Sequence, residues 1–208
     1  MTITINRELK EYTETFILPL YSKNDKGHNI NHIRYVLERC FRFAPQFTGI
    51  NLDMLYAIAC FHDIAHHIDK KNHETLSADF FRNDAFMKSF FSAKDFNTIA
   101  EAIEDHRASA TSQPRSDYGK IISSADRSTD VDEFLRRTHA YTLKHQPLAT
   151  SLEMINRAYL HTSEKYGKKG YAKHYVIDPE YDTFRKRISE LIEDRLLFEK
   201  EYKKTNNI

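Results

Sequence analysis

Histidine and aspartate residues are arranged in a way that could bind a metal ion. Of the 11 histidines in 208 residues, six lie between His28 and His73, and histidine is the commonest metal ligand in proteins. The pair His62-Asp63 comes near the end of an apolar helical segment, where an imidazole and a carboxylate can bend toward one point. Chance alone supplies about one such dipeptide in a chain of this composition. The pair therefore needs support from its surroundings.

Two other segments provide that support. His32 shares a predicted helix face with Cys40, so it should point inward, and Asp126 ends an apolar run as a buried carboxylate would. Buried ionisable groups need partners, and one divalent cation would satisfy all four side chains. Two imidazoles and two carboxylates form a mixed nitrogen and oxygen set that suits Mn, Fe, Co, Ni or Zn. We therefore predict a metal site formed by His32, His62, Asp63 and Asp126.

The order of these four residues resembles that of the HD superfamily of metal-dependent phosphohydrolases. Residues 62–65, 72–78, 103–106 and 120–127 also resemble the corresponding segments of small HD hydrolases, and the resemblance extends over residues 28–130. It implies an all-helical enzyme that needs a divalent ion (Mn, Fe, Co, Ni, Zn or Mg). In such an enzyme a metal-activated water attacks a phosphate ester or anhydride of a nucleotide or related small molecule.

The chain also departs from the family pattern. Small members often have arginine three residues after the first ligand, where this chain has Tyr35 preceded by Arg34. Some nucleotidases and alarmone hydrolases have acids just beyond the His-Asp pair, where this chain has His66 and His67. The substrates of those branches are therefore not carried over to this protein.

Other histidines near the predicted ligands could take part in catalysis. His66 could donate a proton to the leaving group or bind phosphate, with a solvated helix end as the ordinary alternative. His73 and His106 could bind a second metal or the substrate, or could simply be hydrogen-bonded, partly buried side chains. His28 is the alternative to His32 as the first ligand. Glu74 could orient a ligand histidine.

Three cations near Asp126 are candidates for binding the substrate. Arg115 and Arg127 could hold phosphate oxygens through a bidentate fork, and Lys120 could do so as a point charge. For Arg115, simple solvation at the surface is the alternative.

The elements that must position these residues are predicted to be helices. Glycine and proline number only five each, and no segment has the alternation expected of a sheet strand. Ser92 with Asp95, and the run Asp178-Pro179-Glu180, are typical of helix starts. We predict helices over residues 6–21, 29–43, 51–68, 73–88, 93–108, 117–127, 130–143, 151–166 and 180–203. The fold class is therefore all-α, a single HD-type helical bundle domain with additional C-terminal helices.

The chain length suits one domain with an appended tail. We expect an HD-type helical core over residues 1–160, with the motifs in 28–130. Residues 161–208 then form a basic linker and a C-terminal amphipathic helix that packs on the core. A contact between two copies of the chain is the alternative role for that helix.

Composition limits the partners. A net charge of +1 gives no overall field toward nucleic acid or an anionic membrane, so we expect a small phosphorylated substrate, such as a nucleotide. Nucleic acid is not expected, because only the basic segment 165–174 favours it. The longest apolar stretches are too short to span a membrane, and the N-terminus lacks the features of a secretory signal. A cytoplasmic protein is expected, with Cys40 and Cys60 as reduced core residues.

Three other classes of protein are alternatives to the hydrolase. A zinc protease would use His62 and His66, but position 63 is Asp where that motif has Glu. An HD-fold oxygenase with two irons would need His73 or His106 as ligands of a second metal. A non-catalytic HD-fold nucleotide sensor would keep the fold without needing an intact set of ligands.

Overall fold

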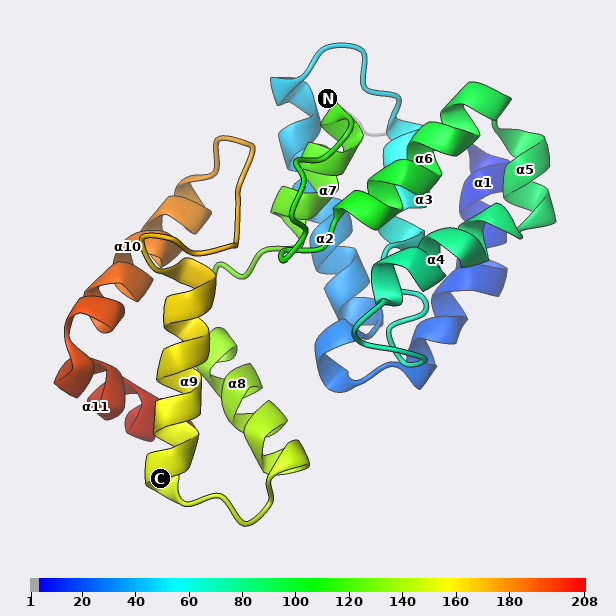
Figure 1. The fold of residues 1–208 in the computed structure, drawn as a ribbon. Coiled ribbons are helices and arrows are strands. Elements are labelled where there is room, and N and C mark those ends of the chain that lie inside the picture. Colours follow the sequence, from blue (N-terminus) through cyan, green and yellow to red (C-terminus); the bar gives the residue numbers. More distant parts are fainter. Residues whose placement is uncertain (1–3) are drawn as a thin grey trace. The chain divides into compact units, whose positions relative to one another are not determined.

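A computed structural model describes residues 4–208, and in this part of the chain all regular structure is helical (Figure 1). The all-α prediction is confirmed. The chain forms two compact units. The first comprises the described residues up to Asp126 together with 174–177, and the second comprises Arg127–Lys173 and Asp178–Ile208. No helix among the described residues is long and apolar enough to cross a membrane.

The first unit contains seven α-helices: α1 (Arg7–Tyr12), α2 (Ile30–Phe43), α3 (Leu52–Phe61), α4 (His73–Arg82), α5 (Ala85–Phe90), α6 (Ala93–Asp105) and α7 (Asp117–Ala125). Between α1 and α2 the chain forms a π segment (Thr13–Ile17) and two 3₁₀ segments (Leu18–Lys23 and Lys26–His28). Polar side chains begin the helices that matter for the site. The side chain of Asn29 accepts from the first-turn N–H groups of α2, and Asn51 does the same for α3. Such caps satisfy N–H groups that have no partner within the helix.

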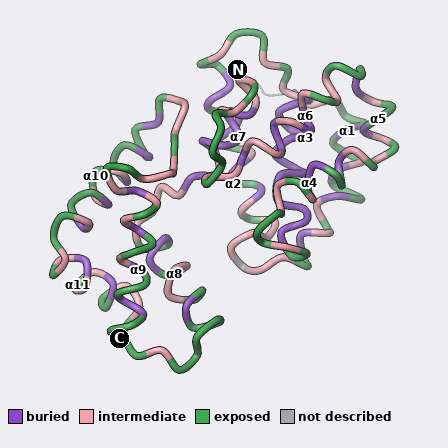
Figure 2. The backbone as a smooth tube through the Cα atoms, viewed as in Figure 1, coloured by how far each residue is buried: buried purple, intermediate pink, exposed green. Residues whose placement is uncertain are grey.

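Helix α3 is the centre of the first unit. Every residue from Met54 to Phe61 is at most 5% exposed, and α3 packs against α2, α4, α6 and α7. Figure 2 shows this buried stretch together with that of α7. A helix that is apolar on all sides is stable only inside other helices. The segment that follows α3 therefore begins in the interior of the unit, with His62 and Asp63 both buried.

The second unit has a separate hydrophobic core. It contains α8 (Val131–His145), α9 (Ser151–Tyr166), α10 (Pro179–Glu193) and α11 (Arg195–Asn206). Buried aromatic and aliphatic side chains from all four helices form the core, among them Leu135, Ile155, Phe184 and Phe198. This division differs from the predicted boundary at residue 160, because α8 and α9 pack with the last two helices in one core.

Several predicted helices are shorter than expected. The helix predicted over 51–68 ends at Phe61, because His62 Nδ1 donates to the carbonyl of Ala59, which would otherwise accept the next helical bond. Residues 62–68 then form turns. The helix predicted over 73–88 breaks where Asp84 caps α5, and the one over 180–203 breaks where Asp194 caps α11. The helix predicted over 6–21 is α-helical only as far as Tyr12. Short polar side chains compete with the helical backbone in this way.

Two predicted helix starts are confirmed. Ser92 caps α6 and accepts from the N–H of Asp95. Asp178 caps α10, which begins at Pro179, and accepts from the N–H of Glu180.

Candidate metal centre

Six candidate ligands lie at the ends of helices in the first unit. They are His32 in the first turn of α2, His62 and Asp63 after α3, His73 at the start of α4, His106 after α6 and Asp126 after α7. The ends of five helices thus come together, although their ligands are spread over 95 positions of the chain, from 32 to 126. This convergence is the structural basis of the site.

Backbone carbonyls fix the orientation of three of the histidines. Each Nδ1 lies against a carbonyl three residues earlier, at 2.9 Å for His62 and Ala59, 3.0 Å for His73 and Lys70, and 2.5 Å for His106 and Ile103. Carbonyls in the last turn of a helix lack partners within it, and two of these acceptors belong to the last turns of α3 and α6. A carbonyl can only accept, so Nδ1 carries the hydrogen. Each Nε2 is then available as a ligand.

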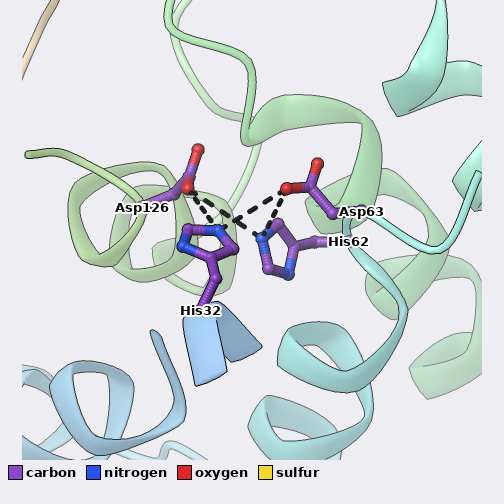
Figure 3. Close-up of side chains that lie close together, drawn as sticks. All are labelled: His32, His62, Asp63 and Asp126. Carbon is purple, nitrogen blue, oxygen red and sulfur yellow. Dashed lines mark ion pairs between the residues drawn. The ribbon is translucent and has the colours of Figure 1, made fainter. Parts of the chain in front are cut away.

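The first set of ligands is the one predicted from the sequence (Figure 3). His32 Nε2 lies 3.1 Å from Asp126 Oδ1 and 3.5 Å from Asp63 Oδ2. His62 Nε2 lies 3.5 Å from Asp63 Oδ2 and 4.0 Å from Asp126 Oδ1. Ligands that surround one ion at 2.0–2.2 Å are about 3.3 Å apart in a tetrahedral arrangement. The four atoms are therefore spaced as ligands of one ion.

His62 supplies a further sign that the site suits a cation. Its side chain is fully buried, and Nε2 has no hydrogen-bond partner among the described residues. A buried nitrogen lone pair without a partner is costly. A bound cation would provide that partner.

A second set of ligands adjoins the first. His73 Nε2 and His106 Nε2 are 3.0 Å apart, and each is 3.4 Å from Asp63 Oδ1. Asp63 therefore faces the first set with Oδ2 and the second set with Oδ1. With both Nδ1 atoms protonated, the second set brings together three electron-rich atoms that repel one another unless a proton or a metal ion lies between them.

The pKa values of the histidines indicate which of them are protonated when no metal is bound. Burial alone would lower the pKa of His32, but the carboxylates of Asp126 and Asp63 raise it to about 9. Burial likewise opposes protonation of His106, yet Asp63 raises its pKa above the ordinary value. Burial lowers the pKa of His62 to about 4, so that imidazole stays neutral. The first set therefore holds a proton on His32 at neutral pH that a metal would displace, and Asp63 favours protonation of His106 in the second set.

A third group, formed by Asp25, His28 and His66, has a different geometry. The rings of His28 and His66 stack with their centroids 3.6 Å apart. Imidazole lone pairs lie in the ring plane, so stacked rings cannot direct two of them at one ion. His28 Nδ1 instead donates to Asp25 Oδ1 at 2.7 Å, and Lys70 Nζ donates to Asp25 Oδ2 at 2.6 Å. The geometry favours His32 over His28 as the first ligand.

His66 lies beside the second set. Its ring is 5.1 Å from that of His73, and the residue is 6% exposed. Nδ1 is buried and has no hydrogen-bond partner among the described residues. Burial lowers the pKa of His66 to about 3, so the ring is neutral. The interior position differs from the solvated helix end considered as its alternative.

The cations predicted to bind phosphate are engaged elsewhere. Arg115 donates to Glu104 and Asp105, and Lys120 donates to Asp117 at 2.8 Å. Arg127 belongs to the second unit, where Nε donates to the carbonyl of Lys173 at 3.3 Å. Their roles in substrate binding stay predictions.

One residue that orders the site was not foreseen. Asn24 Nδ2 donates to the carbonyls of Asp63 and His28, at 2.9 and 3.1 Å, and Asn24 Oδ1 accepts from the N–H of His67 at 3.0 Å. It therefore joins the segment before α2 to the turns after α3. Asn24 lies in a polar turn with nothing in its sequence to set it apart, so only the folded chain reveals it.

Comparison with known families supports the same region. The model of the HD domain family matches residues 29–129, a range that includes all six candidate ligands. Neither the curated proteins nor the solved structures gave a match to this chain.

Proposed function

We propose, from the match of residues 29–129 to the HD domain family, that the protein is a metal-dependent phosphohydrolase. Most members of this family are metal-dependent hydrolases. The proposed reaction is hydrolysis of a phosphate ester or anhydride in a nucleotide or a related small molecule. The observation that carries the proposal is the position of Asp63, whose two carboxylate oxygens face two separate sets of ligand atoms.

The residues present fit divalent cations. Both sets combine imidazole nitrogen and carboxylate oxygen donors, which suits the metals from Mn to Zn. When bound, such cations make a water more acidic and draw charge from a phosphoryl oxygen, so no nucleophilic side chain is needed.

The chain's own residues have defined tasks in this proposal. His62, His73 and His106 donate Nδ1–H to backbone carbonyls, which leaves Nε2 of each ring as the nitrogen that would bind a metal. Asp63 and Asp126 stay ionised, because although burial opposes ionisation the surrounding histidines hold the pKa of both carboxyls well below its usual value. The set is thus preorganised, and little rearrangement is needed when the cations bind.

We assign His66 a contact with the substrate. Its neutral ring lies beside the second set, and its Nδ1 lacks a partner. A phosphoryl or leaving-group oxygen next to the metals would be within reach of this ring. His66 would then hydrogen-bond that oxygen as negative charge develops on it.

The test must also distinguish two other functions. A di-iron oxygenase would also use a second set of ligands that includes His73 and His106, so the geometry meets its requirement. A nucleotide sensor would bind ligand without turnover. The experiment must therefore measure metal, phosphate release and oxygen uptake together.

The test compares the wild type with Asp63→Asn and with Asp79→Asn as a matched control. Asp79 is an exposed carboxylate on α4 that pairs with Arg82. Metal content is measured, and phosphate release is followed with a panel of nucleotides and an aryl phosphate in the presence of Mn, Fe, Co, Ni, Zn or Mg. We expect metal-dependent phosphate release that Asp63→Asn abolishes and Asp79→Asn preserves. Bound metal with oxygen uptake and no phosphate release would favour the oxygenase, and neither activity would favour the sensor.

A further inference from the structure

An ion pair lies directly beside the second set of ligands. Glu74 follows His73 at the start of α4, and Arg107 follows His106 after α6. Arg107 Nη1 donates to both oxygens of Glu74, at 2.7 and 2.8 Å. The residues next to the two metal-binding histidines are thus held together, across the gap between two helix ends.

Arg107 also holds the loop that orients His73. Its Nη1 donates to the carbonyl of Lys71, next to the carbonyl of Lys70 that accepts from His73 Nδ1. Glu74 Oε2 lies 3.4 Å from His73 Nδ1 as well. One nitrogen of the guanidinium, Nη1, therefore acts on both the helix start and the preceding loop.

The first set of ligands does not depend on the ion pair of Glu74 and Arg107. Its members come from the ends of α2, α3 and α7, and Asp63 is the one residue it shares with the second set. The carbonyl of Asp63 is held by Asn24 rather than by Arg107. Loss of the ion pair should therefore disturb one set and spare the other.

We infer that Glu74 and Arg107 are positioning residues that hold His73 and His106 at the separation needed for a second metal ion, and so set whether the centre binds one ion or two. The inference rests on the proposed two-ion centre, but it does not depend on which reaction the centre catalyses.

The chain offers a matched control for this ion pair. Arg82 on α4 pairs with Glu104 on α6 at 2.6 Å, with side-chain exposures of 38% and 24%. Arg107 and Glu74 are 29% and 17% exposed. Both pairs join the same two helix regions through a partly exposed guanidinium. Of the two pairs, only the one formed by Arg107 and Glu74 consists of residues that directly follow the histidines of the second set.

The experiment uses Mn²⁺ as the probe on the full chain. Wild type, Arg107→Ala, Arg107→Lys, Glu74→Gln and Arg82→Ala are loaded with Mn²⁺, and the bound metal is counted by elemental analysis. Electron paramagnetic resonance reports whether two bound Mn²⁺ ions are magnetically coupled, which a general loss of stability would not mimic. Circular dichroism establishes that each variant is folded, and Arg107→Lys provides a milder change should Arg107→Ala not fold.

We expect two coupled Mn²⁺ ions in the wild type and in Arg82→Ala. Arg107→Ala should retain one tightly bound, uncoupled ion and bind the second about 10–100-fold more weakly, as is typical when groups that support metal ligands are removed. Glu74→Gln and Arg107→Lys should weaken the second ion less. Two coupled ions of unchanged affinity in Arg107→Ala would overturn the inference, as would an equal loss in Arg82→Ala. A wild type that binds one ion would also overturn it, while leaving a one-metal hydrolase to be judged by phosphate release.

Discussion

Metal binding should displace protons from this centre, and the effect can be worked out from His32. The pKa of His32 is raised to about 9 in the metal-free chain by the carboxylates beside it, against the opposing effect of burial. A metal needs the lone pair on His32 Nε2, so at any pH below 9 the proton must leave when the metal enters. Affinity for the first ion should therefore rise with pH until about pH 9.

The expected size follows from the pKa. Well below 9, each unit of pH changes the apparent affinity tenfold, which corresponds to about 1.36 kcal/mol. Between pH 6 and pH 8 the first ion should bind about 100-fold more tightly, or about 2.7 kcal/mol. The second ion should show the same direction, because the pKa of His106 is also raised by Asp63 in spite of burial.

Isothermal titration calorimetry in buffers of different protonation enthalpy counts the protons released. We expect about one proton to be released with the first ion at pH 6, where a water on the metal contributes little, since even on zinc its pKa is about 7. His73→Ala, which removes one ligand of the second set, should bind one ion and release about one proton. An enthalpy independent of buffer, with an affinity that does not change between pH 6 and pH 8, would refute the assignment of the proton to His32.

Other predictions concern stability and the supporting residues. Free metal at 100-fold above its Kd stabilises the folded protein by about 2.7 kcal/mol. Excess chelator, which removes that metal, should therefore lower the melting temperature in scanning calorimetry by roughly 5–10 °C. Phe81→Ala should cost about 3–5 kcal/mol in urea unfolding, because the ring is fully buried and stacks on Phe96; a loss below 1 kcal/mol would contradict this packing. Asn24→Ala should weaken metal binding about tenfold, measured by competition with a chelating dye, because it frees the carbonyl of Asp63. Metal-free protein should be most stable near pH 6.5 in urea unfolding. Burial lowers the pKa of His62 to about 4, so stability falls as pH drops below 6.5, and the raised pKa of His32 makes it fall as pH rises toward 9.

The sequence predicted the parts of the site that depend on residue type and order. His32, His62, Asp63 and Asp126 were recognisable because buried imidazoles and carboxylates need a common partner, and the structure brings them together. Helix starts at Ser92 and Asp178 were recognisable from local capping chemistry. Such signals lie within a few residues of one another, or in the composition of one helix face.

The sequence could not predict features that depend on distant parts of the chain. Helices α3 and α4 end at Phe61 and Arg82, where the side chains of the next residues, His62 and Asn83, donate to carbonyls of the last turn, although a helical pattern continues through both positions. Asp63 faces a second set of ligands only because the fold brings the start of α4 and the end of α6 together beside it. Arg107 looked like any surface arginine, since its partner Glu74 lies 33 positions earlier.

The position of the ligands at helix ends has an energetic consequence. Helices α3, α6 and α7 each end one residue before a ligand of the centre, so that His62, His106 and Asp126 are their C-caps. A helix C-terminus carries about half a negative charge, and its attraction for a cation is worth about 0.3–1 kcal/mol. Three such ends together contribute at most a few kcal/mol, and the N-termini of α2 and α4, which carry partial positive charge, oppose part of that. Structural zinc sites, by comparison, bind with about 10–16 kcal/mol. Ligand geometry must therefore dominate. Moving a helix end should weaken the site chiefly by misplacing its ligand, and replacing the ligand at that end should weaken it far more than adding a positive charge nearby.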